Sequence, residues 1–310
     1  MQTILGSNGI IGTTVAKELP SYTDKIRLVS RNPKKLEGPY EMMPADITDP
    51  EQVRIAVKGS EVTYLTAGLR YDIKVWREQW PKIMENVINA CKESGSKLVF
   101  FDNVYLYGNV DGWMTEESPA NPCSKKGEVR AKIATRLMEE AKAGNIKALI
   151  ARAADFYGPD SPLSFVNVLV FENLMKNKTP QWMIDADKKH SFSYTPDAGK
   201  ATALLGNTDS AYNQVWHVPG DHNTLTGREF IAQAAEAFGK DQKKFTVLKE
   251  WMLRGIGIFV PELKESVEML YQSRHEYLFD SSKFHKAFSK PYVTYAEGIK
   301  ATAESMKNKA

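Results

Sequence analysis

The chain has 310 residues, of which 42% are hydrophobic and 25% are charged. This mixture is typical of a globular protein that buries a sizeable core, and the length is enough for about two ordinary domains. The 41 basic and 38 acidic residues leave a net charge of +3, too small to indicate a nucleic-acid or membrane partner. No apolar run approaches the roughly 18 residues that a membrane span requires. We therefore expect neither nucleic acid nor membrane among its partners.

The cysteines and histidines indicate no metal or redox chemistry. Cys91 and Cys123 cannot form a disulfide framework, and neither stands in a Cys-x-x-Cys pair. The five histidines have no ligand spacing with one another or with a cysteine, so we expect no metal. The first residues lack the charged region that begins a signal peptide. Together these features favour a cytoplasmic protein with reduced thiols.

A glycine-rich turn follows the first apolar run. Thr3–Leu5 predicts a strand, and apolar residues from Ile10 to Leu19 recur at helical spacing until Pro20. Three glycines stand between the strand and the helix. Gly6 permits a tight exit from the strand, Gly9 lets the backbone approach a pyrophosphate closely, and Gly12 allows close packing of the helix on the sheet. An ordinary β–loop–α turn is the alternative. The residues expected to bind a dinucleotide here are Gly6, Ser7, Asn8, Gly9, Ile10, Ile11 and Gly12.

The second predicted strand, Lys25–Val29, ends in a basic turn. An NAD site usually places a carboxylate at this point to bind the ribose 2′-hydroxyl. Here Ser30 and Arg31 occupy it, followed by Lys34. A guanidinium can hold a 2′-phosphate bidentately, and lysine adds positive charge. We therefore predict NADP(H), with NAD(H) the less favoured cofactor; a solvated basic turn is the alternative.

Strands and helices continue to alternate. After a third strand, Asp46 and Ile47 are placed to contact an adenine, and Asp49 is placed as a helix N-cap. A fourth strand, Val62–Gly68, ends in small residues, Ala67 and Gly68 among them, as a strand end beneath a cofactor requires. This alternation predicts an α/β protein with a doubly wound parallel sheet and ligands at the strand ends. Later elements are a helix with apolar residues from Trp76 to Cys91 and strands at Lys97–Phe101 and Ala148–Ala151.

An ordered set of motifs resembles the extended short-chain dehydrogenases/reductases, the NAD(P)-dependent epimerase/dehydratase family. The resemblance covers about residues 3–240 and implies a Rossmann sheet, a pyridine nucleotide and a small-molecule substrate. The matching pieces are Gly6-x-x-Gly9-x-x-Gly12, Asp46–Asp49, Val104–Gly108, Arg152–Pro159, Phe192–Asp197 and Trp216–Val218.

The resemblance also implies a domain division. A nucleotide-binding domain is expected over residues 1–156 plus about 192–222. A smaller, mostly helical substrate or lid domain is expected over 157–191 plus 223–310, with helices at Trp251–Val260 and Leu263–Tyr271. Members of the family often pair through a four-helix interface, so a homodimer is expected only by analogy.

The catalytic motif of the family is missing. Its tyrosine is followed four residues later by a lysine that lowers the phenol pKa, but none of the 13 tyrosines here has such a lysine. In the region that resembles this motif, Lys132 stands at the lysine position and Glu128 at the tyrosine position. Asn103 stands where the family has serine or threonine. The pattern resembles atypical members of the superfamily.

Several residues remain candidates for chemistry. Glu128 is either an acid–base group or half of an exposed i,i+4 pair with Lys132. Asn103 either donates to a carbonyl or forms an Asx turn. Tyr105 is free to point into a cleft, and Asp102 is a carboxylate at a strand end. His190 is either a substrate contact or a surface histidine.

Three functions stay open at this point. The first is an NADP(H)-dependent oxidoreductase or epimerase/dehydratase-like enzyme that acts on a small carbonyl or hydroxyl compound with non-standard acid–base residues. The second is an NADP(H)-binding sensor without turnover, similar to the NmrA-like regulators. The third is an assembly factor that uses the same fold.

Overall fold

The computed structural model describes residues 1–241, 244–257, 259–289 and 292–309. Residue 258 of the helix predicted at Trp251–Val260 lies outside them. The chain forms two compact units. The first comprises Met1–Leu106, Lys125–Ala153 and Ala198–Val218, and the second comprises Tyr107–Ser124, Ala154–Asp197 and Pro219–Ala310. Segments 107–124, 154–156, 192–197 and about 219–222, expected in the nucleotide-binding domain, belong to the second unit.

A seven-stranded parallel sheet forms the centre of the first unit. Its spatial order is β11-β7-β5-β4-β1-β2-β3, so the chain leaves β1 in one direction and returns to the other side of β1 with β4. This reversal confirms the doubly wound Rossmann arrangement expected from the alternation of elements. The strands are β1 (Gln2–Leu5), β2 (Ile26–Ser30), β3 (Tyr40–Pro44), β4 (Val62–Leu65), β5 (Lys97–Asn103), β7 (Ala148–Ala153) and β11 (Val215–His217).

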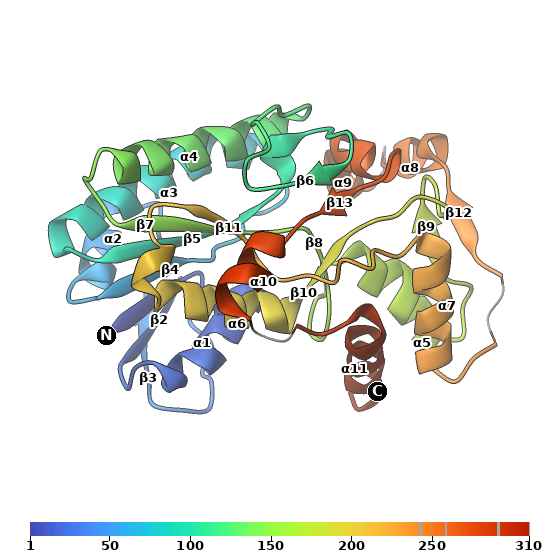
Figure 1. The fold of residues 1–310 in the computed structure, drawn as a ribbon, viewed down its shortest axis with the longest axis horizontal. Helices are drawn as coiled ribbons and strands as arrows, with labels where there is room; N and C mark the ends of the chain where they lie inside the picture. The colour runs from blue at the N-terminus through green and yellow to red at the C-terminus, as the bar shows by residue number, and fades with distance from the viewer. Residues whose placement is uncertain (242–243, 258, 290–291, 310) are drawn as a thin grey trace. The chain divides into compact units, whose positions relative to one another are not determined.

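Helices cover both faces of this sheet (Figure 1). On one face, α2 (Pro50–Val57), α3 (Ile73–Ser94) and α4 (Lys125–Lys142) share a core with the strands. On the other lie α1 (Ile10–Glu18) and α6 (Thr195–Gly206), whose residues from Ala198 onward belong to this unit. Because both faces are covered, the central strands β1 and β4 are buried throughout.

Helix starts follow the capping residues in the sequence. Asp49 accepts hydrogen bonds from the backbone N–H groups of Glu51 and Gln52 at the start of α2, which confirms it as an N-cap. Asp72 caps α3 in the same way through Lys74 and Val75. The short 3₁₀ helices of this unit are η1 (Leu19–Ser21), η2 (Tyr105–Tyr107, whose last residue belongs to the second unit) and η4 (Asp209–Ala211).

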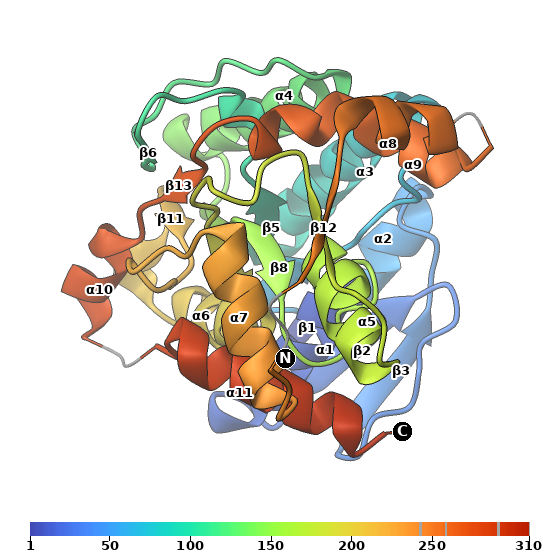
Figure 2. The same cartoon turned by 90° about the vertical axis from the view of Figure 1, so that its right-hand side faces the viewer.

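The second unit combines helices with three two-stranded parallel sheets, β8–β10, β9–β12 and β6–β13. Figure 2 shows α7 and α11 side by side, and their apolar residues share a core with Tyr157 and Phe192. The strands are β6 (Trp113–Met114), β8 (Asp155–Tyr157), β9 (Gln181–Met183), β10 (Phe192–Tyr194), β12 (Thr246–Leu248) and β13 (Leu278–Phe279). The helices are η3 (Asn167–Phe171), α5 (Glu172–Met175), α7 (Gly227–Ala237), α8 (Glu250–Gly257), α9 (Pro261–Ser266), η5 (Val267–Ser273), α10 (Ser282–Phe288) and α11 (Tyr295–Lys307). Among the described helices, none is both long and apolar enough to cross a membrane.

Candidate functional site

The three glycines of the first turn differ in whether the fold could accept a side chain in their place. Gly6 has φ +93°, and a Cβ there would lie 2.5 Å from Ala67 Cα. A Cβ on Gly12 would lie 2.6 Å from the Gly6 carbonyl oxygen. Gly9 is exposed and extended, and a Cβ there would meet its nearest atom at an ordinary 3.4 Å. The fold therefore requires glycine at positions 6 and 12, whereas at position 9 its absence of a side chain leaves the turn open to a ligand.

The N-terminus of α1 begins at this open turn. Gly9 is its N-cap, no side chain caps it, and no acidic residue occupies its first turn. A helix N-terminus of this kind presents N–H groups and a partial positive charge to an anion. Two nearby hydroxyls, Ser7 Oγ and Ser30 Oγ, are buried and have no hydrogen-bond partner in the described part of the chain. Unpaired buried hydroxyls at the ends of β1 and β2 fit a ligand that supplies their partners.

Asn8 joins the glycine turn to the basic turn after β2. Its Nδ2 donates to the Asn32 carbonyl at 2.7 Å, and its Oδ1 accepts from the Lys34 backbone N–H at 2.9 Å. Both ends of the amide are thus used within the protein, which makes Asn8 a positioning residue. Arg31 lies within the turn that Asn8 holds, and its side chain is exposed. β2 ends at Ser30 rather than at a carboxylate.

The Asp46–Thr48 segment also turns back on itself. Asp46 Oδ1 accepts from the backbone N–H of Thr48 at 2.9 Å and from its hydroxyl at 2.8 Å. These bonds lower the pKa of Asp46 below its usual value, with a smaller contribution from the charge of Arg31. Ile47 is half-buried, and Asn86 donates to its carbonyl oxygen. After β4, Ala67 packs against Gly6 and fills the place that a Cβ on Gly6 would need. Gly68 is exposed, and a Cβ there would meet no atom within 4 Å.

At the end of β5, Asn103 and Tyr105 have defined local partners. Asn103 Oδ1 accepts from the Tyr105 backbone N–H at 3.1 Å, which is the Asx-turn geometry. The Tyr105 ring stacks on Trp76 with centroids 6.4 Å apart. Tyr71 contacts the same indole edge-on, at 5.6 Å. The two tyrosines therefore flank one tryptophan near the ends of β4 and β5.

Asp102 is a structural carboxylate rather than a free acid. It is fully buried between Arg130, whose Nε donates to it at 2.7 Å, and Arg152, at 3.1 Å. The guanidinium of Arg130 also lies 4.5 Å from the Trp80 ring centroid. The strand β5 continues two residues beyond the predicted end at Phe101, and this extension carries Asp102 into the core.

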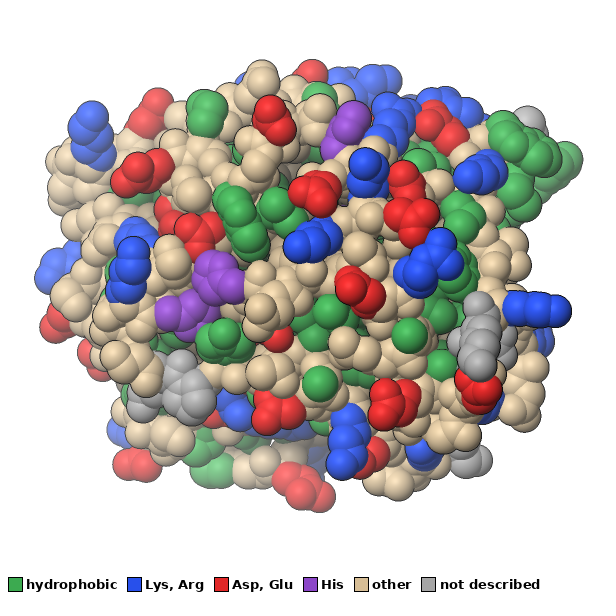
Figure 3. Space-filling model, turned by 45° about the vertical axis from the view of Figure 1, so that its right-hand side comes forward, with side chains coloured by type: hydrophobic (Ala, Val, Ile, Leu, Met, Phe, Trp, Pro, Cys, Tyr) green, Lys and Arg blue, Asp and Glu red, His purple; other side chains and the backbone are tan. Residues whose placement is uncertain are grey.

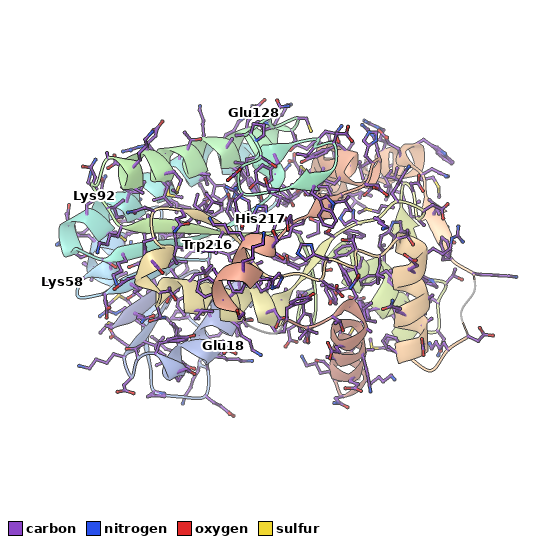
Figure 4. The ribbon with its side chains drawn as sticks, in the orientation of Figure 1. Glu18, Lys58, Lys92, Glu128, Trp216 and His217 are labelled. Carbon is purple, nitrogen blue, oxygen red and sulfur yellow. The ribbon has the colours of Figure 1, made fainter. Side chains whose placement is uncertain are left out.

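Helix α4 places the predicted pair Glu128 and Lys132 on its exposed side. The Glu128 side chain is 61% exposed and lies 3.7 Å from Arg77; Figure 4 shows it on the outer side of the helix. Lys132 is also exposed. Lys126 is instead fully buried, and its Nζ lies 4.6 Å from the Tyr71 ring centroid. The buried lysine of this helix therefore lies six residues before the position predicted from the motif.

Lys126 and Tyr71 were missed in the sequence, although helical spacing contained a signal for Lys126. Val129, Ile133 and Leu137 define the buried face, and Lys126 precedes Val129 by three residues. Glu128 and Lys132 each come one residue before a member of that face, Val129 and Ile133, and both are exposed. Nothing in the sequence around Tyr71 indicated its place beside α4, because that contact joins segments more than 50 residues apart.

The second unit buries a histidine–aspartate pair. His190 Nε2 lies 2.8 Å from Asp155 Oδ2, and the imidazole is 4% exposed. Its ring stacks on Tyr277 with centroids 4.7 Å apart. His190 is therefore a packed residue and not a surface histidine. No group of three or more potential metal ligands occurs in the part of the chain that the structure describes.

The sheet topology, glycine turn and open helix N-terminus together define a Rossmann fold of the dinucleotide-binding type. Residues 3–217 match the model of the NAD dependent epimerase/dehydratase family, and the chain belongs to this family. No curated protein matches its sequence.

Solved structures of similar fold cover nearly the whole chain. The dTDP-glucose 4,6-dehydratase DesIV from Streptomyces venezuelae, with NAD bound, is 17% identical, has a TM-score of 0.80 and aligns over 99% of this chain and 97% of that one. The UDP-glucose 4-epimerase of Thermus thermophilus, in complex with NAD, is 19% identical with a TM-score of 0.79 over 100% of both chains. The Thermotoga maritima UDP-glucose 4-epimerase, with UDP-glucose, is 18% identical with a TM-score of 0.80 over 100% of this chain and 99% of that one. At these identities the likeness shows the extended short-chain dehydrogenase/reductase fold.

Proposed function

We propose that this protein is an NADP(H)-dependent oxidoreductase or epimerase/dehydratase-like enzyme that acts on a small carbonyl or hydroxyl compound. The observation that carries the cofactor assignment is the turn after β2, where Asn8 holds a basic segment beside the open N-terminus of α1. A 2′-phosphate needs cationic partners, and this turn offers Arg31 where β2 ends at Ser30 rather than at a carboxylate. The relatives crystallised with NAD make NAD(H) the competing assignment.

Each residue of the site has a distinct role in holding the dinucleotide. The N-terminus of α1 and the backbone at Gly9 bind the pyrophosphate. The hydroxyls of Ser7 and Ser30 gain the partners that they lack within the described part of the protein. Arg31 and Lys34 bind the 2′-phosphate, and Ile47 packs on the adenine with Asp46 beside it. The bound cofactor supplies or accepts a hydride.

Replacing Arg31 with aspartate tests the cofactor assignment. Loss of a charge-assisted contact predicts that Arg31→Asp weakens NADPH binding by about 10- to 100-fold and NADH binding by no more than about threefold, measured by calorimetry. Lys58→Asp is the matched control, because Lys58 is exposed at the C-terminal end of α2 (Figure 4). Equal losses for both nucleotides would refute the 2′-phosphate contact.

For the chemical step, we assign the lysine role of the family to Lys126. A cation beside a phenol favours the phenolate, which lets tyrosine exchange a proton with a substrate oxygen near neutral pH. Tyr71 lies beside Lys126 and is the acid–base residue of this proposal. The Nδ2 group of Asn103 donates to the substrate oxygen, since its Oδ1 is engaged by Tyr105. Glu128 and Tyr105 remain the alternatives derived from the sequence.

A comparison of two lysines tests this assignment. Hydride exchange between NADPH and a carbonyl library provides the assay. With a reactive substrate, Lys126→Met is expected to lower kcat/KM by about 100-fold or more, the usual contribution of acid–base assistance. Lys132→Met is expected to change it by less than about threefold, because that side chain is exposed. The reverse result would return the role to Lys132 and overturn the assignment to Lys126.

A non-catalytic NADP(H) sensor is the second candidate. It is favoured by the residue four positions before Lys126, which is Pro122 where the family motif requires tyrosine. A sensor would bind NADPH tightly and show no hydride exchange across the library. In that case Lys126→Met would leave the cellular role of the protein intact.

A further inference from the structure

A basic cavity lies within the second unit, and none of the residues that line it is assigned above to the cofactor. Its volume is about 560 Å³, within the range of small-molecule sites. Charged and polar side chains supply much of its lining, namely Asn109, Cys123, Arg254, Lys264, Glu268, Arg274 and His275. These residues come from the segment before α4, from α8, from α9 and from the end of η5, so the cavity joins distant parts of the sequence.

Two arginines of this cavity are fixed in place by one carboxylate. Glu250 Oε1 accepts from Arg254 Nε at 2.9 Å and from Arg274 Nη2 at 2.8 Å. Its Oε2 accepts from Arg274 Nε at 3.2 Å. The two guanidiniums lower the pKa of Glu250, which keeps it ionised. Each guanidinium retains Nη1 donors that Glu250 does not engage, because this carboxylate binds only Nε and Nη2.

The charges around the cavity favour an anion. Arg254, Arg274 and Lys264 contribute three positive charges, and Glu250 and Glu268 contribute two negative ones, so one positive charge remains. Paired guanidiniums with pre-oriented donors bind phosphate or carboxylate groups well.

Two large apolar side chains on and just after α8 are exposed. Trp251 is 74% exposed and lies one helical turn before Arg254 on α8. Phe259, just after α8, is 85% exposed. Figure 3 shows apolar side chains gathered at the corner that α8 and the following residues form, with lysine and arginine side chains beside them. Exposed aromatic residues in such a group mark a binding surface.

We propose that this cavity binds an organic anion that carries an apolar group. Arg254 and Arg274 bind its phosphate or carboxylate, and Trp251 contacts its apolar part. The ligand is a soluble compound, because the cations line a concave site. The proposal concerns ligand class and does not rest on the cofactor assignment.

The experiment uses 2-naphthyl phosphate as the probe, with inorganic phosphate and 2-naphthol as its separate halves. Calorimetry on the full chain is expected to show 2-naphthyl phosphate binding at least about 10-fold more tightly than either half. The double variant Arg254→Gln/Arg274→Gln should lose at least about 10-fold of this affinity. Trp251→Ser should weaken the binding of 2-naphthyl phosphate and leave the affinity for inorganic phosphate unchanged. Arg228→Gln is the control, since Arg228 is an exposed arginine of the same unit paired with Asp187.

Unchanged affinity in the double arginine variant would overturn the proposal. NADPH affinity, measured on the same variants, should equal that of the wild type. If the wild type does not bind NADPH, the proposed function is refuted, but the proposal for this cavity is not. Sedimentation with phosphatidylglycerol vesicles separates a soluble ligand from a lipid headgroup. We expect the protein to stay in the supernatant, and co-sedimentation that needs both arginines would overturn the soluble-ligand assignment.

Discussion

The carboxylate of Asp102 is buried between two guanidiniums. Because Arg130 and Arg152 are also buried, neither can turn to water if its partner is removed. A broken buried ion pair leaves an uncompensated charge, which is much more destabilising than the loss of a surface pair. This explains why a carboxylate at a strand end, a usual place for chemistry, has a structural role in this chain.

Asp102→Asn therefore provides a stability prediction. Removing the charge should lower the free energy of unfolding by about 3–5 kcal/mol, measured by urea denaturation. Glu51→Gln breaks the solvent-exposed pair with Arg54 and should leave the free energy of unfolding close to that of the wild type. If Asp102→Asn lowers the free energy of unfolding by less than about 1 kcal/mol, the ion pairs of Asp102 with Arg130 and Arg152 do not stabilise the core.

Among the elements, the β1–α1 turn separates the requirements of folding from those of binding. Gly6 needs a left-handed backbone and also lies against Ala67, whereas Gly9 needs neither. The motif in the sequence predicted three glycines with three roles. The contacts around them show which two the fold itself requires.

Three alanine variants test this separation. Gly6→Ala should lower the free energy of unfolding by roughly 2–3 kcal/mol through strain and the clash with Ala67. Gly59 has φ +76°, but a Cβ there would meet no atom within 4 Å, so Gly59→Ala should lower the free energy of unfolding by only about 1 kcal/mol. Gly9→Ala should keep its stability within about 0.5 kcal/mol and bind NADPH at least about 10-fold more weakly. Wild-type NADPH affinity in Gly9→Ala would exclude a close backbone approach there.

Helix α4 shows how a motif and a periodicity can point to different residues. Matching the family motif placed the functional lysine at position 132. The apolar spacing of the same helix places position 126 on the buried face. Spacing follows from the geometry of the helix, so it is the firmer guide where the motif is incomplete.

For the whole molecule, ligand binding predicts a shift in thermal stability. A nucleotide that binds the folded state alone stabilises it by about 2.7 kcal/mol at a concentration 100 times its Kd. This corresponds to a rise in Tm of roughly 4 °C for a chain of this size, measured by calorimetric scanning. NADPH should produce the rise in the wild type, and the same NADPH concentration should produce a much smaller one in Arg31→Asp. An equal rise in both would contradict the role of Arg31.

The sequence by itself determined the parallel sheet, its glycine turn, the Asp49 cap and the family. These properties depend on local spacing and on the order of motifs, both of which can be read along the chain. Only the tertiary structure decided which polar groups are buried and what they contact. The placement of Lys126 beside Tyr71, of Asp102 between two arginines, and of Arg254 beside Arg274 each joins residues distant in sequence. Such contacts arise from packing, which periodicity alone does not specify.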